Sequence, residues 1–573
     1  MGERILYLWL RFRWFIIVGV TLLAVLAGAL GGTLTREGAV SPSTTLPQEA
    51  AEEALVVADG ENALAACDDI ESPQDLFACR VSLEPRTPIV LNADGQSFLV
   101  NGSWQTADGT SDVISLPGAT PGLLERMAAG VTVDLENDGF PEYVIASGAD
   151  GEAALRVLSE NPGGGLRDTA EIRGLGDVKN VNFILPVDVN YDGWLDLVVS
   201  SAQTAVADRQ DLKPGSVWYK LYIFENRGWE APGTFTLAGL LPTAKEGAGI
   251  SAILLVDGHV ADVDRDGALD IVVVDRRGLA AIHWGSRTAA LPEGRPLEFE
   301  IPVGATGLDL GDVDGDGDID LAVSYDVSLG GAANTFCSGQ SNGRPCTIEP
   351  GMSLYGGVAI MAQGPVREFT LSTSLSIKDI RNASDVTLAD LDGDRYLSVI
   401  VARETVDGSG GVTAYRPEIG GDGVASFQEA ERIGNEAVSK LRTVDLNRDG
   451  LPDIAMTGRG TTKTQLWLNT NAPGRYIHLD IRGGAGFAAV GTSRSALGVQ
   501  VAVTDVDSKT VTTHVDSDQL EEGLLLALPL TKGAWAGTEA VPRVEIVFPS
   551  TGRTLTLTNV ATGERRTVEE PAN

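Results

Sequence analysis

The sequence has few histidines and cysteines, and it is short of basic residues. The four histidines, His259, His283, His478 and His514, are scattered without metal-ligand spacing, so we expect each to be a surface or strand residue. The CxxC pairs of zinc and redox sites are also missing. Lys and Arg number 43 against 79 Asp and Glu, which gives a net charge of -36. This balance argues against nucleic-acid binding, because such binding needs basic patches.

Acidic turns are what the sequence has in abundance, and the clearest spans residues 312–320. Aspartates stand at positions 1, 3, 5 and 9 of this loop, with Gly317 at position 6. Glycine allows a backbone turn that other residues resist. Calcium prefers six to eight oxygen ligands at roughly 2.3–2.6 Å, and alternate carboxylates on a tight loop supply them. The loop therefore predicts a calcium site.

The same pattern occurs six times, so the chain contains an internal repeat. The six copies are Asp134, Glu136, Asp138, Gly139 and Glu142; Asp188, Asn190, Asp192, Gly193 and Asp196; Asp262, Asp264, Asp266, Gly267 and Asp270; Asp312, Asp314, Asp316, Gly317 and Asp320; Asp390, Asp392 and Asp394; and Asp445, Asn447, Asp449, Gly450 and Asp453. In the fifth copy Arg395 replaces the glycine and Ser398 replaces the last carboxylate. That copy is either a metal site or a plain acidic turn.

An EF-hand is a rival interpretation because its loop opens in the same way. It needs a bidentate Glu at position 12 and a helix on each side. Position 12 is instead Ile145, Val199, Val273, Val323, Val401 or Met456 in the six copies. The flanks are short β-branched runs bounded by Gly and Asp, which predict strands. Acidic turns without metal are the other alternative, and six aligned copies argue against it.

A repeat of about 50 residues with four short strands is typical of a β-propeller blade. We therefore predict an all-β protein with a propeller over residues 87–470. Seven blades fit this length if N-terminal strands complete a blade, and six are the alternative. After residue 470 the acidic loops stop and polar and apolar residues alternate. Residues 471–573 predict a small β-sandwich or barrel-like domain.

The N-terminus carries an export segment, residues 1–34. Three arginines precede an apolar run over residues 14–30, a length at the short end for a membrane span. Positive residues in front of the run predict that the rest of the chain crosses the membrane. Residues 27–29 resemble a cleavage site, so the segment is a cleaved signal peptide or an uncleaved transmembrane anchor. We favour the anchor, because residues 31–34 extend the run without charge.

Residues 35–86 predict a linker followed by a short segment that holds the first cysteine pair. An even number of cysteines in two close pairs, on an exported chain, predicts the disulfides Cys67–Cys79 and Cys337–Cys346. Free thiols are the alternative. The second pair lies in the insertion after the fourth loop.

The acidic loops resemble the FG-GAP/VCBS repeats of integrin-alpha-type β-propellers. The resemblance implies that each loop joins two adjacent strands of a blade and that its Asp, Asn and Glu residues hold Ca2+. The first loop departs by using Glu twice. The C-terminal segments 497–501 and 544–552 are similar to the ASPIC/UnbV domain of cartilage-acidic-protein-like exported proteins. Residues 524–530 depart from that family's pattern.

The functional expectation is an exported or membrane-anchored, calcium-binding propeller that acts as an extracellular binding or adhesion module. Its partner is an extracellular protein or glycan. An extracellular polysaccharide hydrolase or lyase on a propeller frame is one alternative, and a structural envelope protein is another. Residues 339–343 match G-x-S-x-G, but they lie between two cysteines without the strand and helix of a nucleophile elbow. We predict no catalytic residue and no cofactor other than calcium.

Overall fold

The computed structural model describes the chain in segments, and each statement below concerns these segments. They are residues 83–85, 89–90, 127–138, 142–147, 154–160, 166–204, 217–241, 255–287, 296–327, 355–364, 367–392, 396–404, 410–420, 423–434, 437–444, 452–457, 463–469, 475–484, 492, 496–504, 510–514, 524–528, 540–561 and 565–571. The predicted export segment, the linker start, both cysteine pairs and residues 339–343 lie outside them. Among the described segments, none forms a helix suited to crossing a membrane.

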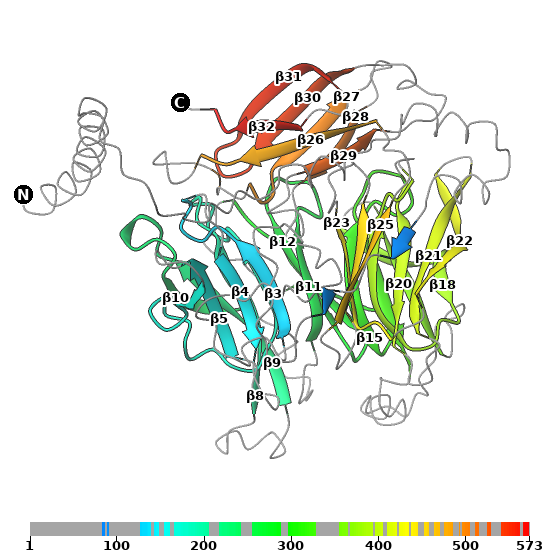
Figure 1. Ribbon diagram of the computed structural model, residues 1–573, viewed down its shortest axis with the longest axis horizontal. Helices are drawn as coiled ribbons and strands as arrows, with labels where there is room; N and C mark the ends of the chain where they lie inside the picture. Colours follow the sequence, from blue (N-terminus) through cyan, green and yellow to red (C-terminus); the bar gives the residue numbers. More distant parts are fainter. Residues whose placement is uncertain are drawn as a thin grey trace, which may run out of the picture. The chain divides into compact units, whose positions relative to one another are not determined.

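The described residues form strands and one short 3-10 helix, η1 (Gly228–Glu230), so the all-β prediction is confirmed (Figure 1). Five antiparallel four-stranded sheets follow one another along the chain. Their strands are β3 (Met127–Val133), β4 (Glu142–Ser147), β5 (Ala154–Glu160) and β6 (Leu166–Asp168); β7 (Val181–Val187), β8 (Asp196–Thr204), β9 (Val217–Asn226) and β10 (Phe235–Leu241); β11 (Leu255–Ala261), β12 (Asp270–Asp275), β13 (Leu279–His283) and β14 (Leu297–Glu300); β15 (Ala305–Gly311), β16 (Asp320–Asp326), β17 (Gly356–Gly364) and β18 (Glu368–Lys378); and β19 (Ala383–Ala389), β20 (Ser398–Arg403), β21 (Gly411–Ile419) and β22 (Val424–Ile433).

A sixth sheet joins strands from distant parts of the sequence. It contains β23 (Lys440–Val444), β24 (Asp453–Thr457) and β25 (Lys463–Asn469). Beside β25 lie β1 (Leu83–Pro85) and β2 (Ile89–Val90), both antiparallel to it. Strands from before the first acidic loop therefore complete the last sheet. The sequence had offered N-terminal strands only for a blade without a good metal loop, whereas this sheet carries the sixth acidic loop.

Burial falls from the second strand of a sheet to its outer edge. Every residue of β12 and of β16 is buried, which matches their continuous apolar runs. In the edge strand β10 five of seven residues are exposed or half-buried, and so are most residues of the edge strand β22. The sheets therefore bury their inner strands against neighbouring sheets and expose their outer strands.

The first strands of consecutive sheets contact each other in the order β3, β7, β11, β15, β19 and β23. Hydrophobic clusters span adjacent sheets, for example Val272 and Ile282 with Leu308 and Leu321. This is a propeller-like arrangement. The described residues hold six such sheets, residues 91–126 lie outside the description, and the number of blades stays a prediction.

Charged side chains link three of the first strands. Asp257 on β11, Asp385 on β19 and Lys440 on β23 each stand five residues before an acidic loop. Lys440 Nζ lies 3.1 Å from Asp257 Oδ2 and 3.3 Å from Asp385 Oδ1. One lysine thus ties together strands that are as far as 183 residues apart in sequence.

The C-terminal strands form two further sheets. One has the order β29-β26-β32 and the other β28-β27-β30-β31. Their bounds are β26 (Arg475–Arg482), β27 (Gln500–Thr504), β28 (Thr510–His514), β29 (Leu524–Leu528), β30 (Ala540–Phe548), β31 (Arg553–Ala561) and β32 (Arg565–Glu569). Ile477, Val501 and Phe548 belong to one hydrophobic cluster, so the two sheets share a core, as in a β-sandwich.

Candidate metal centres

Every acidic loop joins the first two strands of its sheet, as the family resemblance implied. The residue at position 9 is always the first residue of the second strand, and it pairs with the last residue of the first strand. These pairs are Val133 with Glu142, Val187 with Asp196, Ala261 with Asp270, Gly311 with Asp320, Ala389 with Ser398, and Val444 with Asp453. The strands on both sides exclude an EF-hand.

The loops share two left-handed backbone positions. Position 4 has a positive φ at Asn137, Tyr191, Arg265 and Gly315. Position 6 has one at Gly193, Gly267 and Gly317, with φ of 88°, 86° and 99°. A residue with a Cβ is strained there, which explains the glycine at position 6. In the third and fourth loops the side chains of positions 1, 3 and 9 come together.

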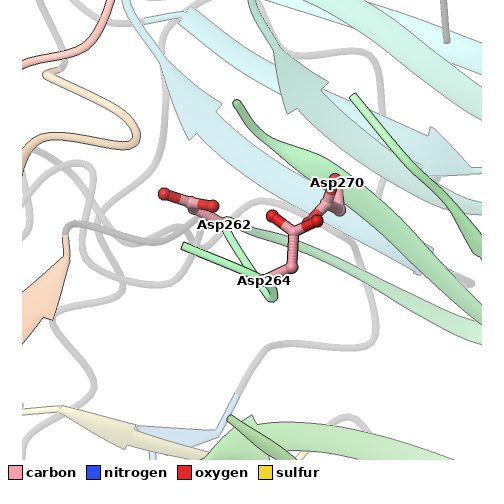
Figure 2. Close-up of side chains that lie close together, drawn as sticks. All are labelled: Asp262, Asp264 and Asp270. Atoms are coloured by element: carbon pink, nitrogen blue, oxygen red, sulfur yellow. The ribbon is translucent and has the colours of Figure 1, made fainter. Parts of the chain in front are cut away.

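The third loop brings three carboxylates together. Asp262, Asp264 and Asp270 each offer an oxygen, and these oxygens all lie within 4.8 Å of one another (Figure 2). Asp262 Oδ1 is buried without a hydrogen-bond partner among the described residues. Burial, with repulsion from neighbouring aspartates, raises the pKa of Asp262 to about 6 and that of Asp270 to about 8. A divalent cation would satisfy the unpartnered oxygen and offset the repulsion.

The fourth loop repeats this geometry. Asp312, Asp314 and Asp320 form a second group with oxygens within 4.8 Å of one another. Burial and the neighbouring carboxylates raise the pKa of Asp320 to about 7. Among the described residues, groups of three or more potential metal ligands at this spacing occur in these two loops. The donor set is all oxygen, which fits Ca2+ or another hard cation.

Arg367 contacts the third loop from the fourth sheet. Its Nη2 pairs with Asp264 Oδ2 and lies 3.2 Å from Asp266 Oδ2. The guanidinium also lies 4.4 Å from the centre of the Trp284 ring. The Arg367 side chain is 43% exposed, so it is free to move away from the carboxylates.

The carboxylate at position 9 has a second role that sequence reasoning missed. In the third loop, Asp270 Oδ2 accepts the backbone N–H of Val263 at 2.9 Å, and Oδ1 accepts that of Gly285 at 2.7 Å. Equivalent pairs of bonds reach Asp196 and Asp320. Asp453 accepts the N–H of Asn469 at 2.7 Å. Through these bonds the position 9 side chain fixes the loop to the end of the third strand of its sheet.

Two asparagines at strand ends connect loops of neighbouring sheets. Asn226 Nδ2 donates to the carbonyl of Leu135 in the first loop at 2.9 Å. Asn469 Nδ2 donates to the carbonyl of Leu391 in the fifth loop at 2.8 Å. The sequence showed strands closing on asparagine, but it did not show that each amide binds the previous sheet's loop.

The second loop is compact and bonded internally. Asp188 Oδ2 accepts the N–H of Gly193 at 2.9 Å, and Asn190 Nδ2 donates to Glu225 Oε1 at 3.0 Å. Burial and repulsion from Asp192 raise the pKa of Asp188 to about 7, and the pKa of Asp196 is well above its ordinary value for similar reasons.

The first loop contains a guanidinium among its carboxylates. Arg173 Nη2 lies 2.5 Å from Glu136 Oε1 and 2.9 Å from Glu142 Oε1. Burial raises the pKa of Glu142 to about 8, against the opposing effect of Arg173. Asp134 Oδ1 accepts the N–H of Asp138 at 3.1 Å. Sequence reasoning did not find Arg173, and the two glutamates were the available indication that this loop is different.

The fifth and sixth loops are described in part. Asp390 and Asp392 are within the description, and Asp453 is fully buried. Asp394, Asp445, Asn447 and Asp449 lie outside it. Ser398, at position 9 of the fifth loop, has a buried hydroxyl without a partner among the described residues. Metal binding by these two loops stays a prediction.

Comparison with known proteins supports the repeat. Residues 262–323, which hold the third and fourth loops, match the family model of the FG-GAP-like repeat. No curated protein matches the chain. Among solved structures, BBS1N in complex with ARL6DN, soaked with mercury, is 12% identical with a TM-score of 0.30, over 60% of this chain and 92% of that one. The lead-soaked form of that complex is 12% identical with a TM-score of 0.30, over 61% of this chain and 94% of that one. The propeller-like fold therefore rests on the sheets described above and on the repeat.

Proposed function

We propose that the protein is a calcium-stabilised β-propeller that acts as an extracellular binding or adhesion module. The calcium proposal rests on two clusters of aspartates, one in the third loop and one in the fourth. Each gathers three buried or half-buried aspartates within 4.8 Å. Like charges at this distance destabilise a fold unless protons or a cation neutralise them.

In this proposal Asp262, Asp264 and Asp270 hold one ion, and Asp312, Asp314 and Asp320 hold another. Each ion would bind carboxylates on the loop and at the start of the second strand, and would so link the first two strands of its sheet. The second, fifth and sixth loops are further candidates, with the ligands that the sequence predicted, and the first loop is a separate case. Bound Ca2+ stabilises the folded state by about 2.7 kcal/mol when the free ion is at a hundred times its dissociation constant.

The binding role is supported by the FG-GAP-like repeat and by the succession of four-stranded sheets. We propose that the partner is an extracellular protein or glycan, reached because residues 1–34 export or anchor the chain. We also propose two disulfides in the exported protein and an ASPIC/UnbV-like identity for the C-terminal sheets. The last proposal rests on the segments 497–501 and 544–552.

Removing calcium tests the first part. We expect EDTA to lower the Tm of the full chain by several degrees, and added Ca2+ to restore it. Asp264→Ala should lose one bound ion per chain, because it removes the ligand at position 3. Asp318→Ala is the matched control, since Asp318 lies in an acidic loop but outside the aspartate cluster, 44% exposed and 3.4 Å from Arg265. A Tm that EDTA leaves unchanged would contradict the calcium proposal.

A glycan and protein array, probed with and without Ca2+, tests the binding role. Calcium-dependent retention of a glycan or protein without turnover supports the module. Turnover of a polysaccharide would favour the hydrolase or lyase. Retention of nothing on either array would favour the structural envelope protein.

A further inference from the structure

We propose that Arg173 takes the place of a metal ion in the first acidic loop, so that this loop works without calcium. The inference rests on the proposed function, because it distinguishes the first loop from loops proposed to hold ions. The sequence predicted metal ligands in all six loops, including the first with its two glutamates. The structure differs among them in what faces the carboxylates.

The guanidinium of Arg173 is enclosed, and each of its three nitrogens has an acceptor. Nη2 donates to Glu136 Oε1 at 2.5 Å, to Glu142 Oε1 at 2.9 Å and to Ser159 Oγ at 3.1 Å. Nε donates to Thr169 Oγ1 at 2.9 Å, and Nη1 donates to the carbonyl of Gly233 at 2.8 Å. The side chain is only 7% exposed. This is a built site for a planar cation, with acceptors around all three nitrogens.

The backbone on both sides of the arginine is shaped to fit it. Gly233 has a positive φ of 65°, and a Cβ there would lie 2.1 Å from Arg173 Nη1. The N–H of Arg173 donates to Thr169 at 3.1 Å, and its carbonyl accepts the N–H of Phe235 at 2.8 Å. The arginine is therefore held from the ends of two different sheets, and any side chain at position 233 would displace it.

Glutamate at position 9 completes the arrangement. Glu142 Oε2 accepts the N–H of Leu135 at 3.0 Å, which is the bond that Asp270 makes to Val263. In the second, third and fourth sheets the second oxygen of the position 9 aspartate accepts a backbone N–H. In the first loop the second oxygen, Glu142 Oε1, accepts a hydrogen bond from Arg173 Nη2 instead. The longer glutamate lets one carboxylate bind both the loop and the guanidinium.

An ion and this guanidinium are competing occupants of the loop. Both are cations that need the carboxylates of Glu136 and Glu142, and an arginine has no acceptor with which to bind a metal. A guanidinium stays charged at any pH that a folded protein tolerates. The first loop therefore carries a permanent counter-charge of its own.

Calcium counting on the full chain tests this inference. Glu136→Ala and Asp264→Ala are matched, because each removes the position 3 side-chain oxygens, and in each loop the position 3 carboxylate pairs with an arginine. We expect Glu136→Ala to keep the wild-type number of ions, measured by native mass spectrometry and calcium titration. Asp264→Ala should lose one. Loss of one ion by Glu136→Ala as well would overturn the inference.

A second variant separates this inference from the calcium proposal. Arg173→Met should lower the Tm in EDTA, since it leaves buried carboxylates without their cation. If Asp264→Ala binds as many ions as the wild type, the calcium proposal fails for the third loop, and the EDTA measurement still decides the role of Arg173. An unchanged Tm for Arg173→Met in EDTA would overturn that role. Glu136→Ala keeps the test available if Arg173→Met does not fold, because Glu136 is 37% exposed.

Discussion

The first and third acidic loops share one scaffold and differ in the cation that faces them. In both, position 9 begins the second strand and accepts the N–H of position 2. In the first loop a guanidinium with 7% exposure sits between two glutamates. In the third loop Arg367 reaches the aspartates from a side chain that is 43% exposed.

This difference separates two ways to neutralise a carboxylate loop. A buried guanidinium is permanent and covalently part of the chain, and its bonds have fixed directions. A bound ion exchanges with solvent, and its contribution depends on its concentration. Stability without metal should therefore come from the first sheet, and calcium dependence should come from the third and fourth loops.

The strongest disruption of the third loop should come from position 9. Asp270→Ala removes the acceptors of two backbone N–H groups, from Val263 and Gly285. Leaving both unsatisfied should cost about 3–5 kcal/mol in the free energy of unfolding. Urea unfolding in EDTA measures this cost separately from calcium.

Ser398→Ala is the matched control, because Ser398 occupies position 9 of the fifth loop. Its buried hydroxyl has no partner among the described residues, so its removal leaves no polar group newly unsatisfied and should cost less than about 1 kcal/mol. Equal costs for the two variants would show that position 9 does not fix the loops.

The pH dependence of the metal-free protein should sharpen the comparison further. The pKa of Asp270 is about 8 and that of Asp320 about 7 in the folded chain, against an ordinary value of 3.8. Between the ordinary and the raised pKa, the folded chain therefore binds more protons than the unfolded chain. The contribution of these two groups to the free energy of unfolding is greatest at low pH and falls as the pH rises from about 4 to 8. In EDTA, we expect the Tm to fall over this range.

Saturating calcium should reduce this slope, because the ion favours the ionised carboxylates. Asp270→Asn should also reduce it in EDTA, since the amide does not titrate. Scanning calorimetry at several pH values checks both expectations. A metal-free Tm that rises from pH 5 to 8 would contradict them.

The smallest effect should come from removing the exposed arginine of the third loop. Arg367→Ala frees Asp264 from a competing cation, so calcium should bind this loop more tightly, by about fivefold if the pair is worth about 1 kcal/mol. Arg432→Ala is the control, because Arg432 pairs with Glu429 on β22 and touches no acidic loop in the described structure. Calcium titration of both variants measures the difference, and weaker binding by Arg367→Ala would mean that the arginine supports the site.

The repeat and the strand positions could be predicted because both are local in sequence. Residues 312–323 carry the oxygen ligands, the turn glycine and the following strand within one short stretch. The all-β fold and the loops between strands followed from this pattern. The glycine at position 6 was also predicted, since its positive φ is a property of the turn itself.

The remaining features depend on contacts that the local pattern does not encode. Arg173 reaches Glu136 from 37 residues away, and Lys440 reaches Asp257 from 183. The first pair forms when the chain after β6 folds back on the loop between β3 and β4, and the second forms only when the sheets are arranged in a particular order. The roles of Asn226 and Asn469 were missed for the same reason, since each amide binds a loop of the neighbouring sheet.

The pairing of β1 with β25 has a mechanical consequence. Leu83 lies opposite Asn469, so the chain leading into β1 and the chain leaving β25 depart from the same end of the sheet. Tension applied between these two departures would open the short strand pair like a zipper, one hydrogen bond at a time, instead of shearing the whole row at once. Because β1 pairs with β25 over only three residues, a pull between these two points would load a short strand pair directly.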